Sequence, residues 1–315
     1  EEKLIGNVEF KQGGTTIKCD VAKRTVGKDP VALLGHVQIL DESRSLFADT
    51  VYVYQDAQKQ VASGNVISIT ASDTTTAQRI TYYDEENKIV SEQDVRIVDR
   101  EENRIVTGER AEYLRDEKYG EISGNPTLTR ADSLGNETMR VKGDTMEVFK
   151  GGDETLVRGN VKITNPNATS TCGQAVYFKK EEKTLLTENP KVIQRNRQIV
   201  GDTLWLFLED SQLSRASVVG HASATSDADT LNKGRWVNKL SGQNINFYFE
   251  DKQLKKVIID NQATSLYHII EEGEYKGANE VSGDKIIAFM SDGVAKRVVV
   301  KSDPDMSSGK YVPPR

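Results

Sequence analysis

Apolar and polar residues alternate along most of this chain, in short runs separated by polar turns. Residues 141–163 are the clearest example: Val-Lys-Gly-Asp-Thr-Met-Glu-Val-Phe leads into a turn, and Leu-Val-Arg-Gly-Asn-Val-Lys-Ile follows it. A period of two is typical of strands that bury one face. The stretch therefore predicts two short strands joined by a polar turn. The same unit recurs about nine times, which is the signature of a stacked repeat protein.

A first anchor marks the repeat, with Gly-Asn or Gly-His preceding alternating apolar residues. Its first four copies begin at residues 6, 35, 64 and 93, each 29 residues after the last. The spacing then drifts, and three of the copies are degenerate. The copies are Gly6-Asn7, Gly35-His36, Gly64-Asn65, Gln93-Asp94, Gly124-Asn125, Gly159-Asn160, Glu188-Asn189 and Gly220-His221.

A second anchor is a small residue followed by an acid or an amide. Residues two before and three after it are mostly apolar, as Leu46 and Val51 are around Ala48. These positions have opposite parity, so a bulge or corner must absorb one extra residue between them. A small residue suits such a bend. The copies are Cys19-Asp20, Ala48-Asp49, Ala77-Gln78, Gly108-Glu109, Gly143-Asp144, Gly173-Gln174, Gly201-Asp202, Gly242-Gln243 and Gly283-Asp284.

The repeat predicts an all-β fold, with turns such as 83–88, 115–118 and 179–183 between strands rich in Val, Ile, Thr and Tyr. We expect one elongated domain over residues 1–301, with compact repeats over 1–223 and longer ones over 224–301. A polar tail over 302–315 is expected to follow as a linker or chain end.

The longer repeats contain insertions at 224–239 and 271–279. Insertions in repeat proteins form loops on one face, and long loops often carry function. A longer hairpin explains both insertions at least as well.

Composition and charge exclude several classes of protein. Only 37% of the 315 residues are hydrophobic, and the mean hydropathy is −0.55, which fits a thin core between two sheet layers. The net charge of −6 argues against nucleic-acid binding. No run of about 18 apolar residues is present to span a membrane. Cys19 and Cys172 lie five repeats apart, roughly 24 Å at one strand spacing per repeat. We therefore expect no disulfide between them.

Catalytic chemistry is hard to find in this sequence. It contains no Gly-x-Ser-x-Gly, phosphate-binding glycine loop, His-Glu-x-x-His or paired-cysteine motif. His36 and His221 occupy the anchor position that Asn fills elsewhere, so we expect them to be turn residues. The recurring acid favours a structural ladder over a metal site, because amides such as Gln78 interrupt it. We expect a protein that is not an enzyme and uses no cofactor or metal.

The two anchors resemble the OstA-like family, which includes the LptA-type periplasmic proteins of lipopolysaccharide transport. The resemblance rests on Gly159-Asn160-Val161-Lys162-Ile163, on Val141-Lys142-Gly143-Asp144 and on residues 46–54 (Leu-Phe-Ala-Asp-Thr-Val-Tyr-Val-Tyr). It extends from residue 4 to about residue 300. It implies an open, twisted β-jellyroll, folded like a taco around a hydrophobic groove, and a periplasmic location after removal of a signal peptide. The chain departs from the family in its longer repeats.

The resemblance also implies a function and partners. The protein would bind lipopolysaccharide or lipid A and carry its acyl chains in the groove toward the outer membrane. Other Lpt-type jellyrolls would join it end to end by β-strand pairing, and a homo-oligomer is a further option. The inward positions expected to bind lipid are Val8, Phe10, Val37, Ile39, Leu46, Val51, Ile97, Val141, Met146, Val148, Val161, Ile163, Leu204, Leu206, Ile245, Phe247 and Ile286.

Two other hypotheses remain open because a groove and a closed core share one alternation pattern. A closed β-solenoid or sandwich would serve as a scaffold or adhesion module that binds protein or glycan on its outer face. Outward aromatic stripes would favour that hypothesis, and Tyr52, Tyr54, Tyr82 and Tyr83 hint at one. A solenoid enzyme acting on polysaccharide would need a focused carboxylate pair, which the scattered acids do not supply.

Overall fold

The protein is described from a computed structural model, over residues 1–209, 212–229, 234–271, 273–291, 294–303 and 306–314. These residues form β-strands and turns and contain no helix. The chain divides into two compact units, residues 1–157 (unit 1) and 158–315 (unit 2), which we describe separately. The paired strands are antiparallel in both units.

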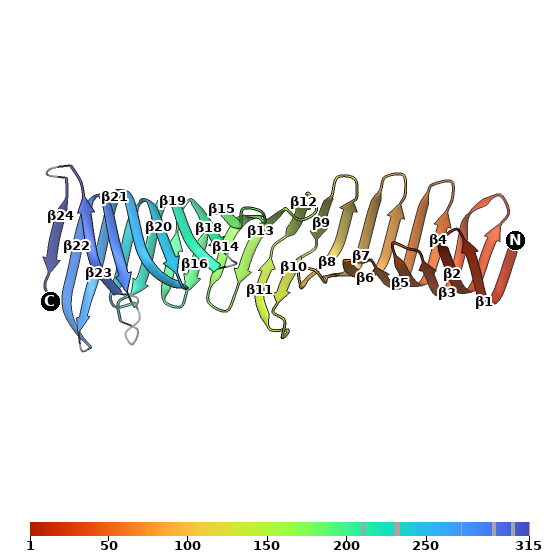
Figure 1. Cartoon of the computed structure of the whole chain (residues 1–315), viewed down its shortest axis with the longest axis horizontal. Helices are drawn as coiled ribbons and strands as arrows, with labels where there is room; N and C mark the ends of the chain where they lie inside the picture. The colour runs from red at the N-terminus through yellow and green to blue at the C-terminus, as the bar shows by residue number, and fades with distance from the viewer. Residues whose placement is uncertain (210–211, 230–233, 272, 292–293, 304–305, 315) are drawn as a thin grey trace. The chain divides into compact units, whose positions relative to one another are not determined.

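In unit 1, eight long strands form a meander in which each strand pairs with the next (Figure 1). Beyond the eighth strand the meander divides, because β9 pairs with one half of β8 and β10 with the other. β11 then pairs with β10, and β12 with β9. The strands are β1 (Glu2–Gln12), β2 (Thr15–Thr25), β3 (Lys28–Leu40), β4 (Ser45–Tyr54), β5 (Lys59–Ile69), β6 (Asp73–Tyr83), β7 (Lys88–Asp99), β8 (Arg104–Leu114), β9 (Tyr119–Ser123), β10 (Thr127–Ala131), β11 (Glu137–Lys142) and β12 (Thr145–Phe149).

Unit 2 repeats this organisation. The two halves of β14 pair with β15 and β16, and the two halves of β19 pair with β17 and β18. Strands β19 to β22 form a meander of long strands, and β23 and β24 pair with the two halves of β22. The strands are β13 (Glu154–Thr164, which spans the division), β14 (Thr169–Phe178), β15 (Lys183–Thr187), β16 (Lys191–Gln194), β17 (Arg197–Val200), β18 (Thr203–Glu209), β19 (Gln212–Asp227), β20 (Val237–Glu250), β21 (Gln253–Glu271), β22 (Glu274–Ser291), β23 (Val294–Lys301) and β24 (Ser308–Val312).

A corner at the two anchors bends each long strand. Between β4 and β5, Phe47 pairs with Ile67 and Thr50 with Ser63, so three residues of β5 lie opposite two of β4. The extra residue comes from the first anchor, where Gly64 and Asn65 have φ of 79° and 45°. All eight copies of the first anchor have positive φ at both residues. The corner expected from side-chain parity is therefore confirmed, but the extra residue lies at the first anchor and not at the second, where it was expected.

Each corner divides its strand into two halves, which lie in two walls. The first wall contains the residues before the second anchor, and the second wall contains the residues after it. Leu46 and Ala48 point inward from the first wall and Val51 from the second, with exposed fractions of 0%, 6% and 0%. Asp49, at the corner itself, is exposed. The predicted change of parity across the anchor is thus confirmed, and both walls share one apolar inner face.

In one repeat, the sequence pattern placed the second anchor one residue too late. Its second anchor is Cys172-Gly173 and not Gly173-Gln174, because Cys172 is buried while Thr171 is exposed. At this corner the acid has moved to the first anchor: a Cβ on Gly173 would lie 2.1 Å from Glu188 Oε2. Here the glycine stands on the strand of the second anchor and the acid on the strand of the first anchor, the reverse of a corner such as Gly64 with Asp49. For this reason the register of the repeat was read one residue too late from the sequence.

The two long repeats contain longer hairpins. β21 ends at Glu271 and β22 begins at Glu274, with residue 272 outside the described residues. β19 and β20 extend into 224–239, of which 230–233 also lie outside the described residues. The expected tail differs from the structure as well, since Ser308–Val312 forms β24; residues 304–305 and 315 lie outside the described part. Cys19 and Cys172 are both free and buried, as expected. Burial raises the pKa of both thiols, that of Cys172 to about 11.

Candidate functional site

The inner face shared by the two walls is the candidate site in each unit. Twelve of the predicted lipid-binding residues are buried, at 8% exposure or less. Four more, Ile97, Val148, Ile163 and Leu206, are half-buried, and Phe10 is 38% exposed. The buried residues are Val8, Val37, Ile39, Leu46, Val51, Val141, Met146, Val161, Leu204, Ile245, Phe247 and Ile286. These twelve side chains therefore point inward, as the alternation predicted. Other residues of the described protein cover them.

A hydrogen bond joins the two walls inside unit 1. The hydroxyl of Tyr82, on the second wall, donates to Ser68 Oγ on the first wall over 3.0 Å, and both residues are buried. The guanidinium of Arg44 lies over the Tyr82 ring, 3.9 Å from its centroid. Tyr82 therefore points inward, contrary to its expected place on an outward aromatic stripe. The walls are in contact at this repeat.

The inner face is uncovered where unit 1 begins. Among the described strands, β1 pairs with β2 alone. Leu4 pairs with the inward Ala22, and Phe10 pairs with Ile17. Leu4 is 53% exposed and Phe10 38% exposed. This edge offers unpaired backbone groups beside inward apolar side chains, which is a template for another strand.

In unit 2, the strands at the last edge are β23 and β24. Val298 on β23 pairs with the inward Ala288 and is 49% exposed, while Tyr311 on β24 is 53% exposed. The apolar inner face is therefore accessible at this edge of unit 2 as well.

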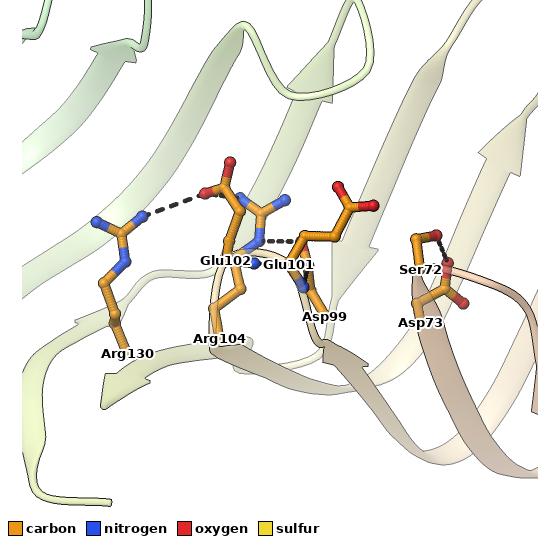
Figure 2. Close-up of polar contacts among 7 residues, drawn as sticks. All are labelled: Ser72, Asp73, Asp99, Glu101, Glu102, Arg104 and Arg130. Carbon is orange, nitrogen blue, oxygen red and sulfur yellow. Dashed lines mark hydrogen bonds and ion pairs between the residues drawn. The ribbon is translucent and has the colours of Figure 1, made fainter. Parts of the chain in front are cut away.

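Polar side chains gather at the turns that precede the second anchor, which we call the first rim. In unit 1, Arg104 Nε donates to Asp99 Oδ2 over 2.9 Å, and Arg130 Nη2 to Glu102 Oε2 over 3.3 Å (Figure 2). Arg100 on the same turn donates to the carbonyl of Ala71 over 2.8 Å. Of the described buried side-chain polar atoms, Arg130 Nε is the one with no hydrogen-bond partner. The first rim of unit 1 thus carries several fixed guanidinium groups.

The corners are held by a polar contact between the two anchors. Asn65 Nδ2 donates to Asp49 Oδ2 over 2.9 Å, and His36 Nδ1 lies 2.8 Å from Asp20 Oδ2. The hydrogen bond with Asp20 raises the pKa of His36. His221 has the same contact with Asp202 at 2.8 Å. The sequence predicted turn residues, but His36 and His221 instead lie at corners within β3 and β19.

The outward neighbour of Met146 is not exposed. Glu147 is only 8% exposed, and the hydroxyl of Tyr119 lies 3.3 Å from its Oε2 and 3.1 Å from Glu121 Oε2. Burial and these carboxylates raise the pKa of Tyr119. Simple alternation would have placed Glu147 in solvent, and the phenol of Tyr119 on β9 covers it instead.

Neither a metal site nor a membrane-spanning helix is found in the described part of the chain. No three His, Cys, Asp or Glu side chains gather there as a metal site would require. None of its elements is a helix of the length and hydropathy needed to cross a membrane.

Comparison with known families bears on the function of the inner face. Residues 24–174 match the family model described as the LptA/(LptD N-terminal domain) LPS transport protein. This part of the chain is similar to LptA and to the N-terminal domain of LptD. The match covers unit 1 from the end of β2 and reaches β14. It confirms the OstA-like resemblance over these residues. Because the family is one of transport proteins, it agrees with the expectation of a protein that is not an enzyme.

A solved structure and the curated proteins add little to this assignment. LptH of Pseudomonas aeruginosa, described as the LptA-homologous periplasmic component of the lipopolysaccharide transport device, is 17% identical. The likeness covers 47% of this chain and 95% of LptH, with a TM-score of 0.34, which is too low to support a detailed comparison. No curated protein matches the chain.

Sequence reasoning missed the residues six positions after the second anchor. Seven of the nine are aromatic once Cys172 is taken as the anchor of its repeat: Tyr54, Tyr83, Phe149, Phe178, Phe207, Tyr248 and Phe289. The signal was present in the sequence. It lies on the outward parity, beyond the positions compared around the second anchor.

Proposed function

We propose that the protein binds lipopolysaccharide in the periplasm and carries it toward the outer membrane, with acyl chains against the inner face. The observation that carries this proposal is the family match over residues 24–174. The inner face supports it, because both walls contribute apolar side chains in the same register from repeat to repeat. A face of this kind offers an acyl chain a series of near-equivalent sites along which it moves without entering water.

Lipid binding requires the two walls to separate, because the described protein buries most of the inward positions. Burial of about ten CH₂ groups is worth about 8 kcal/mol. That gain exceeds the net cost of about 1 kcal/mol for breaking one hydrogen bond such as that of Tyr82 with Ser68. Half-buried residues such as Ile97 are the expected first contacts. The guanidinium groups of Arg100, Arg104 and Arg130 on the first rim would meet phosphate groups of the lipid.

Assembly with other jellyrolls of this type would use the edge strands. The unpaired backbone of β1 and the exposed side chains of Leu4 and Phe10 suit the addition of a strand from a neighbouring domain. In unit 2, the strands β23 and β24 offer a second edge, with Val298 exposed on its inner face.

A closed scaffold is the second candidate function, and the burial of twelve inward residues favours it. The two functions differ in whether an apolar ligand reaches the inner face. Displacement of an apolar fluorescent dye by lipid A separates them, measured on the full chain and on Ile97→Glu, with Arg96→Glu as the outward control. The carrier function predicts displacement that weakens at least tenfold in Ile97→Glu and stays normal in Arg96→Glu. Absence of displaceable dye from the folded wild-type protein would favour the scaffold.

A further inference from the structure

A row of alternating aromatic and cationic side chains crosses the outer face of unit 2. Phe207 pairs directly with Arg215 on the next strand, Arg215 with Tyr248, and Tyr248 with Lys256. All have the parity opposite to the buried Ile245 and Phe247. In strand order the outer row is Phe178, Lys183, Phe207, Arg215, Tyr248, Lys256, Phe289 and Arg297.

The cations of the outer row stack on its rings. Arg215 Cζ lies 3.9 Å from the centroid of Phe207, and Lys256 Nζ lies 4.4 Å from that of Tyr248. Lys183 lies 5.0 Å from the centroid of Phe178. Such pairs fix the orientation of the rings and stabilise the sheet. The rings nevertheless stay accessible, since Phe289 is 40% exposed and the others are half-buried.

A cavity of about 740 Å³ lies over the centre of the outer row. Its lining includes the rings of Phe207, Tyr248 and Phe289, and Phe249 adds a fourth ring. The lining also contains three carboxylates and three cations: Glu181, Glu209, Glu250, Arg215, Lys255 and Lys256. Cross-strand pairing explains the outer row but does not explain a cavity beside it. The cavity is therefore a second observation, independent of the row.

The chemistry of this cavity fits a saccharide. The negative face of an aromatic ring attracts the slightly positive C–H groups on the flat face of a sugar ring. Carboxylates accept hydrogen bonds from sugar hydroxyls, and Lys and Arg donate to them. The described part of the lining holds as many acids as bases, so it gives no net attraction for nucleic acid or an anionic membrane. Aromatic residues recur on every second paired strand, roughly 10 Å apart, which suits a ligand with repeating rings.

We propose that the outer row of unit 2 binds the saccharide chain of the glycolipid whose acyl chains contact the inner face. The inference rests on the proposed function for the identity of the saccharide. Leu208, Glu209, Phe249 and Glu250 place the cavity at the ends of β18 and β20, beyond the second anchor. A saccharide leaving the inner face past these strand ends reaches the outer row directly. Binding there keeps the hydrophilic part of the cargo on the protein during transport.

The test uses lipid-free saccharide, released from bacterial lipopolysaccharide by mild acid, and the full chain. Trp205 reports locally, because its ring lies 6.1 Å from that of Phe207 and 6.2 Å from that of Phe178. The chain has two tryptophans, so in Trp236→Phe the emission comes from Trp205 alone. We expect a saturable change of this emission and a loss of affinity of at least tenfold in Tyr248→Ala. Tyr267→Ala is the matched control, an aromatic on β21 that is 42% exposed and lies outside the row.

Several outcomes would overturn the inference. One is absence of any change in Trp205 emission at saturating saccharide, which needs no destabilising variant. Another is unchanged affinity in Tyr248→Ala, and a third is displacement of the saccharide by a proline-rich peptide that binds more tightly. Lipid A alone distinguishes the two proposals. If lipid A binds and the saccharide does not, only the inference about the outer row fails. If lipid A does not bind, the carrier function fails.

Discussion

Tyr82 and Ser68 form a hydrogen bond of 3.0 Å between the two walls of unit 1, within the buried inner face. Each residue comes from a different wall, so this bond exists only while the walls are in contact. It links the stability of the repeat to the accessibility of the inner face.

Tyr82→Phe removes this bond and leaves the Ser68 hydroxyl buried without its partner. We expect a loss of about 1–2 kcal/mol in the free energy of unfolding, measured with denaturant. The carrier function also predicts tighter binding of an apolar dye, because separation of the walls costs less. Tyr83→Phe, on the outward side, is the control and should change neither quantity. An unchanged dye affinity in Tyr82→Phe would show that this bond does not govern access.

The glycine of the first anchor is required where an acid packs against it. A Cβ on Gly64 would lie 2.3 Å from Asp49 Oδ2, and its φ is +79°. Gly6 has φ of +86° with nothing within 4 Å. Gly6→Ala should cost about 1 kcal/mol for the backbone conformation alone, and Gly64→Ala about 2–4 kcal/mol because the acid must also move. Equal losses in equilibrium unfolding would mean that the contact with Asp49 contributes nothing.

The corner contact of His36 predicts a dependence on pH. Because Asp20 raises the pKa of His36, the folded protein binds the proton more tightly than the unfolded chain. The stabilisation is present below the ordinary histidine pKa of about 6.5 and disappears as pH rises through the folded value. Both side chains are exposed, so the effect on stability is small. NMR titration should give a His36 midpoint that falls in Asp20→Asn; a midpoint that does not move would contradict this account of the corner.

The edge strand β1 predicts how copies of the chain associate. Phe10 and Ile67 are both 38% exposed, but Phe10 lies inward at the edge and Ile67 outward within the sheet. Phe10→Lys should weaken self-association at least tenfold in sedimentation experiments, since it places a charge on the docking face. Ile67→Lys should leave it unchanged. Monomeric wild-type protein at high concentration would argue against pairing between copies.

Side-chain parity predicted the strands, the corners and the inward residues well, because apolar alternation is a local property that the sequence displays directly. Cys172 was misaligned because the acid of its corner sits on the partner strand, at Glu188, where a repeat search does not look for it. The corner at Asn261 and Gln262, which has positive φ at both residues, was missed because it lacks glycine in the first position and Asn, Asp or His in the second. Asn tolerates this conformation, and the surrounding ladder imposes it on Gln.

Whether the inner face is open or closed was beyond the sequence. That property depends on contacts between the walls, such as Tyr82 with Ser68, made by residues fourteen positions apart on different walls. The burial of Glu147 depends in the same way on Tyr119 of another strand. Alternation gives each side chain a face, but the opposite wall determines whether that face meets solvent.

The central claim is that lipid contacts the inner face, and site-specific photo-crosslinking tests it most directly. A photoreactive residue would replace Ile97, which is half-buried on the inner face, and Arg96, its exposed outward neighbour on β7. Ile163 and Lys162 on β13 form a second pair of the same kind. In bacteria that make lipopolysaccharide, we predict adducts with this lipid at 97 and 163 and none at 96 and 162. Absence of adducts at both inward positions in folded protein would contradict the account and leave a sealed core.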